Sequence, residues 1–216
     1  MPFLTGGQIV LEYLKKEKVP YVVGIPGHGC LPLVDAFVGQ DDVRPIMVKH
    51  EQSAAHVADG YYRASGNPLG VFTSVGPGAC NTIVGVATAY VDSSAMVVFT
   101  GSVQTYMMGR GILQEVERKH WSDFWQVIDP VVKRSWQITR VDQLPRVLPQ
   151  AFKLATTGRP GPVHIDLPAD VQAEGADVEV PNPSMHRATG RQRGDSAQVE
   201  RAAALLTGFF AECRAD

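Results

Sequence analysis

The feature that most constrains the fold of this chain is an alternation, over its first 168 residues, of short apolar runs with helical patterns. Strands of a parallel sheet read as short continuous apolar runs, because helices cover both of their faces. Runs of this kind separated by helical stretches are the order expected of βαβ units. The pattern therefore predicts an α/β domain built around a parallel sheet.

The expected strands lie at residues 21–24, 43–48, 69–73, 95–100, 131–136 and 162–167. The expected helices lie at residues 5–18, 31–37, 51–65, 81–89, 121–127 and 142–156. Thr5 and Gln8 have the spacing of an N-terminal capping box, and Gly66 is placed to end the helix that begins at Glu51. Pro149 falls inside an expected helix, which predicts a kink or a late start there.

The residue composition of the chain changes after Pro168. Residues 172–195 are polar and rich in Pro, Gly and Arg, which is typical of a linker. Asp195 is expected to cap a short apolar helix near 199–210, and one helix does not make a domain. We therefore expect a first domain over 1–171, a linker over 172–195, and the truncated start of a central domain over 196–216.

Composition excludes several classes of protein. The formal charge is −2, from 20 Lys+Arg against 22 Asp+Glu, which gives no basic surface for a nucleic acid. Three widely spaced cysteines form neither a metal pattern nor a disulfide framework. The first residues lack the layout of a signal peptide, and no apolar run is long enough to cross a membrane. We expect a cytoplasmic protein without nucleic-acid, membrane or metal sites of its own.

Two motifs, each taken alone, suggest a known type of binding site but lack residues that such a site requires. His50 and His56 are six residues apart, whereas a zinc protease helix needs its two histidines four apart. Gly76-Pro77-Gly78 has the glycine turn of a dinucleotide site, but Asn81 stands at the third glycine and Pro77 lacks an N–H. A Rossmann oxidoreductase is therefore a distant alternative. Glu51 alone could be an acid that interacts favourably with a helix dipole.

Taken together and in order, the motifs over residues 4–171 resemble one family. They are GIPG at 24–27, HEQSAAHVADGYYRASG at 50–66, GPGACN at 76–81, TG at 100–101 and GRPGPVHIDLP at 158–168. These segments resemble thiamine-diphosphate enzymes of the acetolactate synthase and pyruvate decarboxylase superfamily. The resemblance implies the family's pyrimidine-binding domain over 1–171, a three-layer, flavodoxin-like α/β domain with a six-stranded parallel sheet and helices on both faces.

The resemblance implies a chemistry for two residues. Glu51 matches the family's glutamate, which hydrogen-bonds N1′ of the cofactor's aminopyrimidine so that the activated cofactor attacks a 2-oxo acid such as pyruvate. A carboxyl group suits this task because it can share or donate a proton, while the cofactor carries the harder chemistry. His28 lies in the turn that faces the partner active site, where it could shuttle protons or only hydrogen-bond the loop.

The same resemblance implies the other site residues. Those expected beside the pyrimidine ring are Pro26, Gly27, Gly29, Ser74, Gly76, Pro77, Gly78 and Asn81. Gln114 and Lys133 fall near positions that contact substrate or flavin in acetolactate synthases. Ser102 stands where those enzymes usually carry glutamine, so a 2-oxo acid decarboxylase stays open as the alternative enzyme.

The family's C-terminal domain holds the diphosphate and Mg²⁺ through a Gly-Asp-Gly motif, which this sequence lacks. The resemblance therefore implies that this missing domain binds both, that FAD is a further possible cofactor, and that the chain alone is inactive. It also implies pairing into a homodimer or tetramer through the pyrimidine-binding domain. The small residues Ala54, Ala55, Ala58, Gly85, Ala87 and Ala89 permit close approach of helices, between subunits or inside one. A non-catalytic pairing module remains the alternative from another class.

Overall fold

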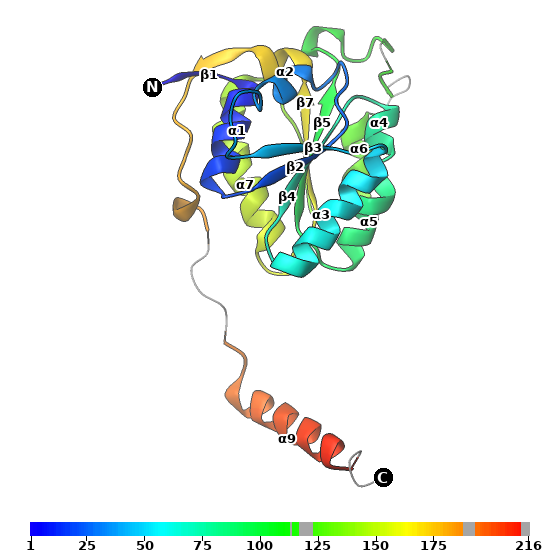
Figure 1. The fold of residues 1–216 in the computed structure, drawn as a ribbon, viewed down its shortest axis with the longest axis vertical. Coiled ribbons are helices and arrows are strands. Elements are labelled where there is room, and N and C mark those ends of the chain that lie inside the picture. The colour runs from blue at the N-terminus through cyan, green and yellow to red at the C-terminus, as the bar shows by residue number, and fades with distance from the viewer. Residues whose placement is uncertain (113, 117–122, 188–192, 213–216) are drawn as a thin grey trace.

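The computed structural model describes residues 1–112, 114–116, 123–187 and 193–212 (Figure 1). Its centre is a sheet of six parallel strands in the order β3-β2-β4-β5-β7-β6. The strands are β2 (Tyr21–Gly24), β3 (Arg44–Met47), β4 (Leu69–Thr73), β5 (Met96–Ser102), β6 (Ser135–Gln137) and β7 (Val163–Pro168). The predicted six-stranded parallel sheet is confirmed.

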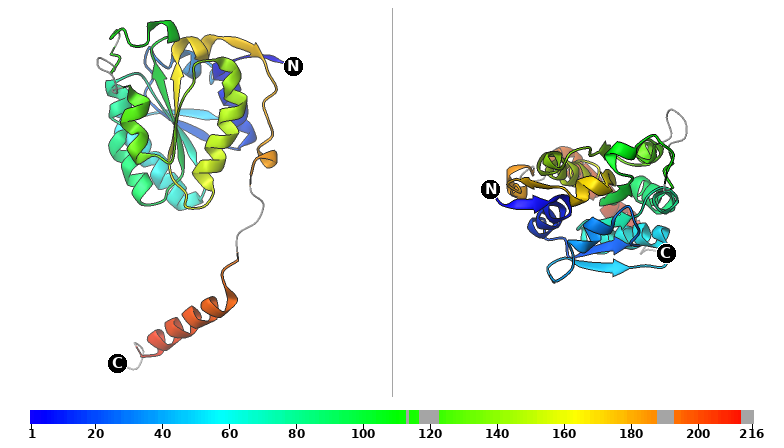
Figure 2. Two further views of the ribbon diagram at one scale, coloured as in Figure 1. Left: turned by 180° about the vertical axis from the view of Figure 1, so that it is seen from behind. Right: turned by 90° about the horizontal axis from the view of Figure 1, so that it is seen from above.

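Helices cover both faces of the sheet (Figure 2). One face carries α1 (Gly6–Lys16) and α7 (Leu144–Thr156), and the other carries α3 (Glu51–Ser65), α5 (Ile83–Val91) and α6 (Phe124–Ile128). The short helices α2 (Leu31–Asp35), α4 (Pro77–Cys80) and α8 (Ala169–Ala173) each follow the carboxyl end of a strand. Every residue of β4, β5 and β7 is buried, as expected for strands covered on both faces.

Local signals set two helix ends as predicted. Thr5 Oγ1 accepts a hydrogen bond from the Gln8 backbone N–H at 3.3 Å, and the Thr5 N–H donates to Gln8 Oε1 at 2.9 Å. This reciprocal pair is the capping box at the start of α1. Gly66 ends α3 with a φ of 72°, a left-handed conformation that glycine adopts at little cost.

Three elements differ from the prediction. The helix expected to start at Asn81 is two helices, since α4 ends at Cys80 and α5 begins at Ile83. The strand expected from Val131 begins only at Ser135, because Asp129–Val131 form a 3-10 turn that contains Pro130. Residues 121 and 122 of the helix expected over 121–127 lie outside the described residues, and α6 starts at Phe124.

Pro149 produces no break in α7, contrary to the expected kink. Its missing N–H would have bonded to the carbonyl of residue 145, which lies in the first turn of the helix. A 3-10 turn over Val141–Gln143 precedes α7, so the helix does start later than Asp142.

The first part of the expected linker packs against the domain. Strand β8 (Gly175–Asp177) pairs antiparallel with β1 (Phe3–Thr5), and Val178 and Val180 are buried. Arg187 forms an ion pair with the Glu17 carboxylate, whose side chain is 1% exposed. The packed domain therefore continues to about residue 187, because its last segment pairs with its first.

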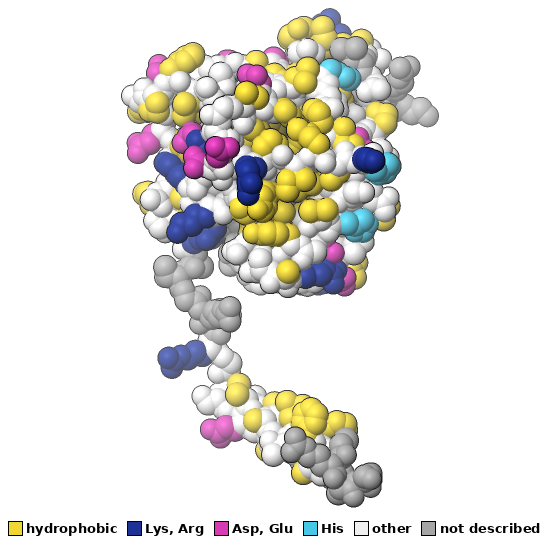
Figure 3. Space-filling model, in the orientation of Figure 1, with side chains coloured by type: hydrophobic (Ala, Val, Ile, Leu, Met, Phe, Trp, Pro, Cys, Tyr) yellow, Lys and Arg dark blue, Asp and Glu magenta, His cyan; other side chains and the backbone are white. Residues whose placement is uncertain are grey.

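Helix α9 (Ser196–Glu212) follows and extends away from the domain (Figure 1). Asp195 Oδ1 accepts from the Gln198 N–H at 2.9 Å, so Asp195 caps this helix as predicted. The described side chains of α9 are exposed, among them the apolar Leu205, Leu206 and Phe209 (Figure 3). Within the described residues, no helix combines the length and apolarity that a membrane span requires.

Candidate functional site

The sheet topology indicates where a ligand would bind. From β2 the chain moves outward to β3, whereas β4 lies on the other side of β2 and leads on to β5. Ligands of open α/β sheets bind at such a switch point, outside the carboxyl ends of the strands. The turns that leave β2 (residues 25–30) and β4 (residues 74–76) lie at this position.

Glu51 is the first residue of α3, and its carboxylate is turned toward the turn that follows β4. Glu51 Oε2 accepts a hydrogen bond from Asn81 Nδ2 at 2.9 Å. A Cβ added at Gly78 would lie 3.2 Å from Glu51 Oε1, so only glycine leaves the space beside that oxygen free. His50 Nδ1 accepts from the Gln52 N–H at 3.2 Å and caps α3, which leaves the Glu51 carboxylate available for other contacts.

Glycines let the two turns pack closely together. A Cβ at Gly27 would lie 2.5 Å from Ser74 Oγ, and one at Gly29 would lie 2.8 Å from Val75 Cγ2. The Gly29 N–H donates to Ser74 Oγ at 3.4 Å. A Cβ at Gly101, near the end of β5, would lie 2.2 Å from the Gly29 carbonyl oxygen. Larger residues at these positions would push the turns apart.

Gly76 forms the sharpest part of the second turn. Its φ of 53° and ψ of −111° are avoided by residues with a side chain, and a Cβ here would lie 1.9 Å from the Gln114 carbonyl oxygen. Pro77 begins α4, where its missing N–H has no helical partner to lose. The structure thus brings together Glu51, Gly27, Gly29, Ser74, Gly76, Pro77, Gly78, Asn81 and the backbone of Gln114.

Lys133 lies apart from this cluster. Its Nζ donates to the carbonyls of Leu154, Thr157 (2.9 Å) and Arg159 (2.8 Å), at and beyond the last turn of α7. Burial lowers the pKa of this ammonium group. Lys133 precedes β6 and so lies toward the amino ends of the strands, where it caps a helix C-terminus. Pro26 and His28 are exposed on the turn after β2.

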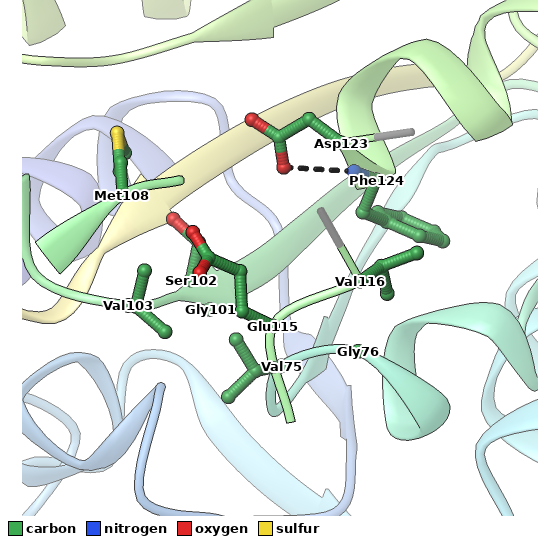
Figure 4. A pocket seen from close by; sticks show the side chains of 10 residues that line it. All are labelled: Val75, Gly76, Gly101, Ser102, Val103, Met108, Glu115, Val116, Asp123 and Phe124. Carbon is green, nitrogen blue, oxygen red and sulfur yellow. Dashed lines mark hydrogen bonds between the residues drawn. The ribbon is translucent and has the colours of Figure 1, made fainter. Parts of the chain in front are cut away.

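A small cavity beside Gly76 contains polar residues that the sequence analysis did not identify (Figure 4). Its volume of about 10 Å³ is room for one water molecule. Glu115 lines it and accepts from the N–H groups of Gly109 and Gly111, each at 2.6 Å. Burial, helped by the nearby charge of Glu115, raises the pKa of Asp123 on the same wall.

Gln172 is a second residue that local sequence does not reveal, because it falls in the segment expected as a linker. Its Nε2 donates to the carbonyls of Gly29 (2.7 Å) and Leu167 (2.6 Å), and its Oε1 accepts from the Leu33 N–H at 3.1 Å. The side chain is 1% exposed. It therefore fixes the turn after β2 from within the domain.

The cluster has the chemistry needed to hold a nitrogen heterocycle. A carboxylate and an amide stand side by side, and glycines keep the backbone near them open. Across the part of the chain that the structure describes, no group of three or more His, Cys, Asp or Glu is placed to bind a metal ion.

Comparisons with known proteins identify the family of the chain. A family model described as the N-terminal TPP binding domain of thiamine pyrophosphate enzymes matches residues 4–121. The chain is 40% identical over 207 residues to a probable acetolactate synthase large subunit of Methanocaldococcus jannaschii, covering 94% of this chain and 34% of that protein. It is 42% identical over 170 residues to the mitochondrial acetolactate synthase catalytic subunit of Saccharomyces cerevisiae, covering 79% and 24%.

A third relative is the acetolactate synthase large subunit of Lactococcus lactis, 40% identical over 182 residues, with 84% of this chain and 30% of that protein covered. The chain spans about a third of the length of these relatives. The family model covers more than half of the chain. This chain therefore belongs to the thiamine pyrophosphate enzymes and carries the N-terminal TPP-binding domain of that family.

Proposed function

We propose that this chain is the pyrimidine-binding part of an acetolactate synthase-like carboligase that acts on 2-oxo acids such as pyruvate. The observation that carries the proposal is the Glu51 carboxylate, which lies at the switch point of the sheet between the Asn81 amide and the open backbone of Gly78. The names of the relatives support the reaction class.

In this proposal Glu51 holds a proton against N1′ of the aminopyrimidine, and Asn81 orients the carboxylate by donating to its other oxygen. The glycines of the two turns let the ring approach the backbone closely. When bound, thiamine diphosphate supplies the carbon nucleophile that attacks the carbonyl group of a 2-oxo acid. His28, exposed on the turn after β2, is a candidate for proton transfer at the neighbouring site.

For the substrate, Gln114 is the better of the two candidates. The side chain of Gln114 is exposed. Its backbone has a φ of 65°, and its carbonyl oxygen lies against Gly76. The three carbonyl groups bound by Lys133 support a structural role for that residue instead.

The proposal includes partners. A diphosphate-binding domain with a Gly-Asp-Gly motif would hold the diphosphate and Mg²⁺, FAD would require a further domain, and the 216 residues alone would not turn over substrate. For pairing with a second copy, the outer face of α5 offers a hollow of about 580 Å³ lined by Ile83, Val84, Ala87, Thr88, Val91 and Asp92. Val84 and Val91 are 57% and 68% exposed there.

The small residues contribute little to such pairing. Ala54, Ala55, Ala58, Gly85 and Ala89 are buried inside this subunit. A Cβ at Gly85 would lie 2.6 Å from that of Ala55, so these residues pack α5 against α3.

The test compares Glu51→Gln with Glu12→Gln, a control on the opposite face of the sheet, in the complete protein that contains this chain. With pyruvate, thiamine diphosphate and Mg²⁺, E51Q should lose about 10²–10⁴-fold in kcat, the usual contribution of a positioned proton-transfer group. Binding of thiamine diphosphate should persist in E51Q, because the diphosphate is held elsewhere. Wild-type turnover by E51Q would refute the role of Glu51.

Product analysis separates the two enzyme classes. Acetolactate as the product supports the carboligase, whereas acetaldehyde as the sole product would replace it by the decarboxylase. The same assay on the isolated 216-residue chain should give neither product, and turnover there would refute its dependence on a further domain.

A further inference from the structure

One face of the buried strands β5 and β7 and of the half-buried edge strand β6 carries a continuous set of polar side chains. These side chains are Thr100 and Ser102 on β5, His164 and Asp166 on β7, and Ser135 and Gln137 on β6. The strand register places Asp166 opposite both Thr100 and Gln137, and His164 opposite Ser135. Buried strands of a parallel sheet are normally apolar, so a polar face of this kind needs a reason.

Asp166 is the centre of this set. Its carboxyl group, 1% exposed, accepts from Thr100 Oγ1 and Ser102 Oγ, each at 3.1 Å, and Asp166 lies opposite Gln137 in the strand register. The same Gln137 amide donates to Asp123 Oδ2 at 2.8 Å. Ser102 is the last residue of β5, and Asp123 immediately precedes α6. Asp166 therefore holds the end of β5, and its register neighbour Gln137 holds the start of α6.

Both tied residues border the candidate cofactor site. Ser102 and Asp123 line the cavity that Gly76 and Glu115 also line (Figure 4). Gly101, next to Ser102, touches the turn after β2, since a Cβ there would lie 2.2 Å from the Gly29 carbonyl oxygen. A shift of Ser102 is thus transmitted to Gly29, and a shift of Asp123 to the cavity wall beside Gly76.

We propose that Asp166 is a positioning residue for the candidate cofactor site, because it holds Ser102 in place beside the glycine turns and lies opposite Gln137, which holds Asp123 on the wall of the same cavity. This inference concerns the site of the proposed function and rests on it for its relevance to catalysis. Its test reads the position of the turns, without turnover or bound cofactor, so it can fail while the role of Glu51 stands.

The titratable groups around Asp166 favour a neutral carboxyl group there. Burial raises the pKa of Asp166 to about 7, and the charge of Asp123 adds to this. His164, on the same strand, is fully buried, which lowers its pKa to about 3 and leaves it uncharged at neutral pH. Glu115 lies beyond Asp123, across the cavity.

The experiment is amide NMR on the ¹⁵N-labelled 216-residue chain, comparing the wild type with Asp166→Ala, Asp166→Asn and the control Ser135→Ala. Ser135 Oγ bonds His164 Nδ1 at 2.6 Å, toward the amino end of the same polar face, so the control removes one bond of the same set away from the site. The two readouts are the side-chain amide of Gln137 and the backbone amides of Gly29 and Gly76.

In both Asp166 variants we expect a changed chemical shift of the Gln137 side-chain amide, together with displaced Gly29 and Gly76 amides. Ser135→Ala should leave all three signals unchanged. As the pH passes through neutrality, the wild-type Gln137 signal should titrate, and that of D166N should not. If D166A does not fold, the spectra of D166N alone test the proposal. Unmoved Gly29 and Gly76 amides in folded D166N, or equal displacement in S135A, would overturn the proposal.

Discussion

Replacing Gly76 with alanine tests whether the turn beneath the candidate site is as tightly closed as the structure shows. Two terms oppose the added methyl group. The backbone conformation, with φ 53° and ψ −111°, costs a residue with a side chain about 1–3 kcal/mol. The new Cβ would also lie 1.9 Å from the Gln114 carbonyl oxygen, and relieving such an overlap costs about 1–3 kcal/mol more. The sum predicts a loss of about 2–6 kcal/mol in the free energy of unfolding.

Gly66→Ala is the matched control for this substitution. Gly66 has a φ of 72°, and a Cβ there meets nothing within 4 Å, so G66A carries only the conformational penalty of about 1 kcal/mol. Urea unfolding followed by circular dichroism gives both free energies by linear extrapolation. The account expects G76A to be the more destabilised by at least about 1 kcal/mol. Equal effects of G76A and G66A would show that the Gln114 backbone does not close on the turn.

Three further predictions follow from buried or capping side chains. Because burial raises the pKa of Asp166 to about 7, the native chain keeps a proton that the unfolded chain releases, and stability should fall as the pH rises from about 4 to about 7. Urea titrations across that pH range give the free energy of unfolding, and its decline should be smaller in D166N than in the wild type by up to about 4 kcal/mol. An equal dependence on pH in D166N and the wild type would contradict the raised pKa of Asp166. Lys133→Met should destabilise the chain by about 1–3 kcal/mol, measured by urea unfolding, because it leaves carbonyls at the end of α7 without their donor. Lys153→Met, on the exposed side of α7, should change stability by less than about 0.5 kcal/mol, and equal effects would refute the capping role of Lys133. Gln172→Leu should destabilise by about 1–3 kcal/mol and shift the Gly29 amide in NMR spectra, and an unmoved amide would show that the turn does not depend on Gln172.

Sequence patterns were sufficient for the sheet and for most of the helices that cover it. Strand β4 occupies the predicted residues, and α3 begins at Glu51 and ends before Gly66 as expected. These elements carry local signals: an apolar run in one case, and a cap and a terminal glycine in the other. Pro149 sits inside a continuous α7, where the lost hydrogen bond falls at the first turn, and of the two predicted effects the late start is the one observed.

What the sequence could not show depends on contacts between distant residues. The pairing of β8 with β1, which extends the domain past residue 171, joins the two ends of the domain and has no local signature. The role of Lys133 follows from the end of α7, more than twenty residues away. Asp166 stood in a predicted buried strand, but only the strand register shows that Thr100 and Gln137 face it.

Three of the residues expected beside the pyrimidine ring lie close together in the structure. Glu51, Gly78 and Asn81 were identified from motifs far apart in sequence, and the structure brings them together. Their proximity follows from the parallel sheet, because Glu51 follows β3 and the other two residues follow β4, and the carboxyl ends of these strands flank that of β2 at one edge. The residues that hold these turns in place, such as Gln172, were missed because they work through buried hydrogen bonds rather than through a motif.

The most direct test of the central claim is a crystal structure of the complete protein that contains this chain, grown with thiamine diphosphate and Mg²⁺. The distance to measure joins the Glu51 carboxylate to N1′ of the aminopyrimidine ring. The account predicts about 2.6–3.0 Å, a hydrogen bond, with Asn81 still donating to the other carboxylate oxygen. A Glu51 carboxylate that faces solvent, with the ring bound elsewhere, would contradict it.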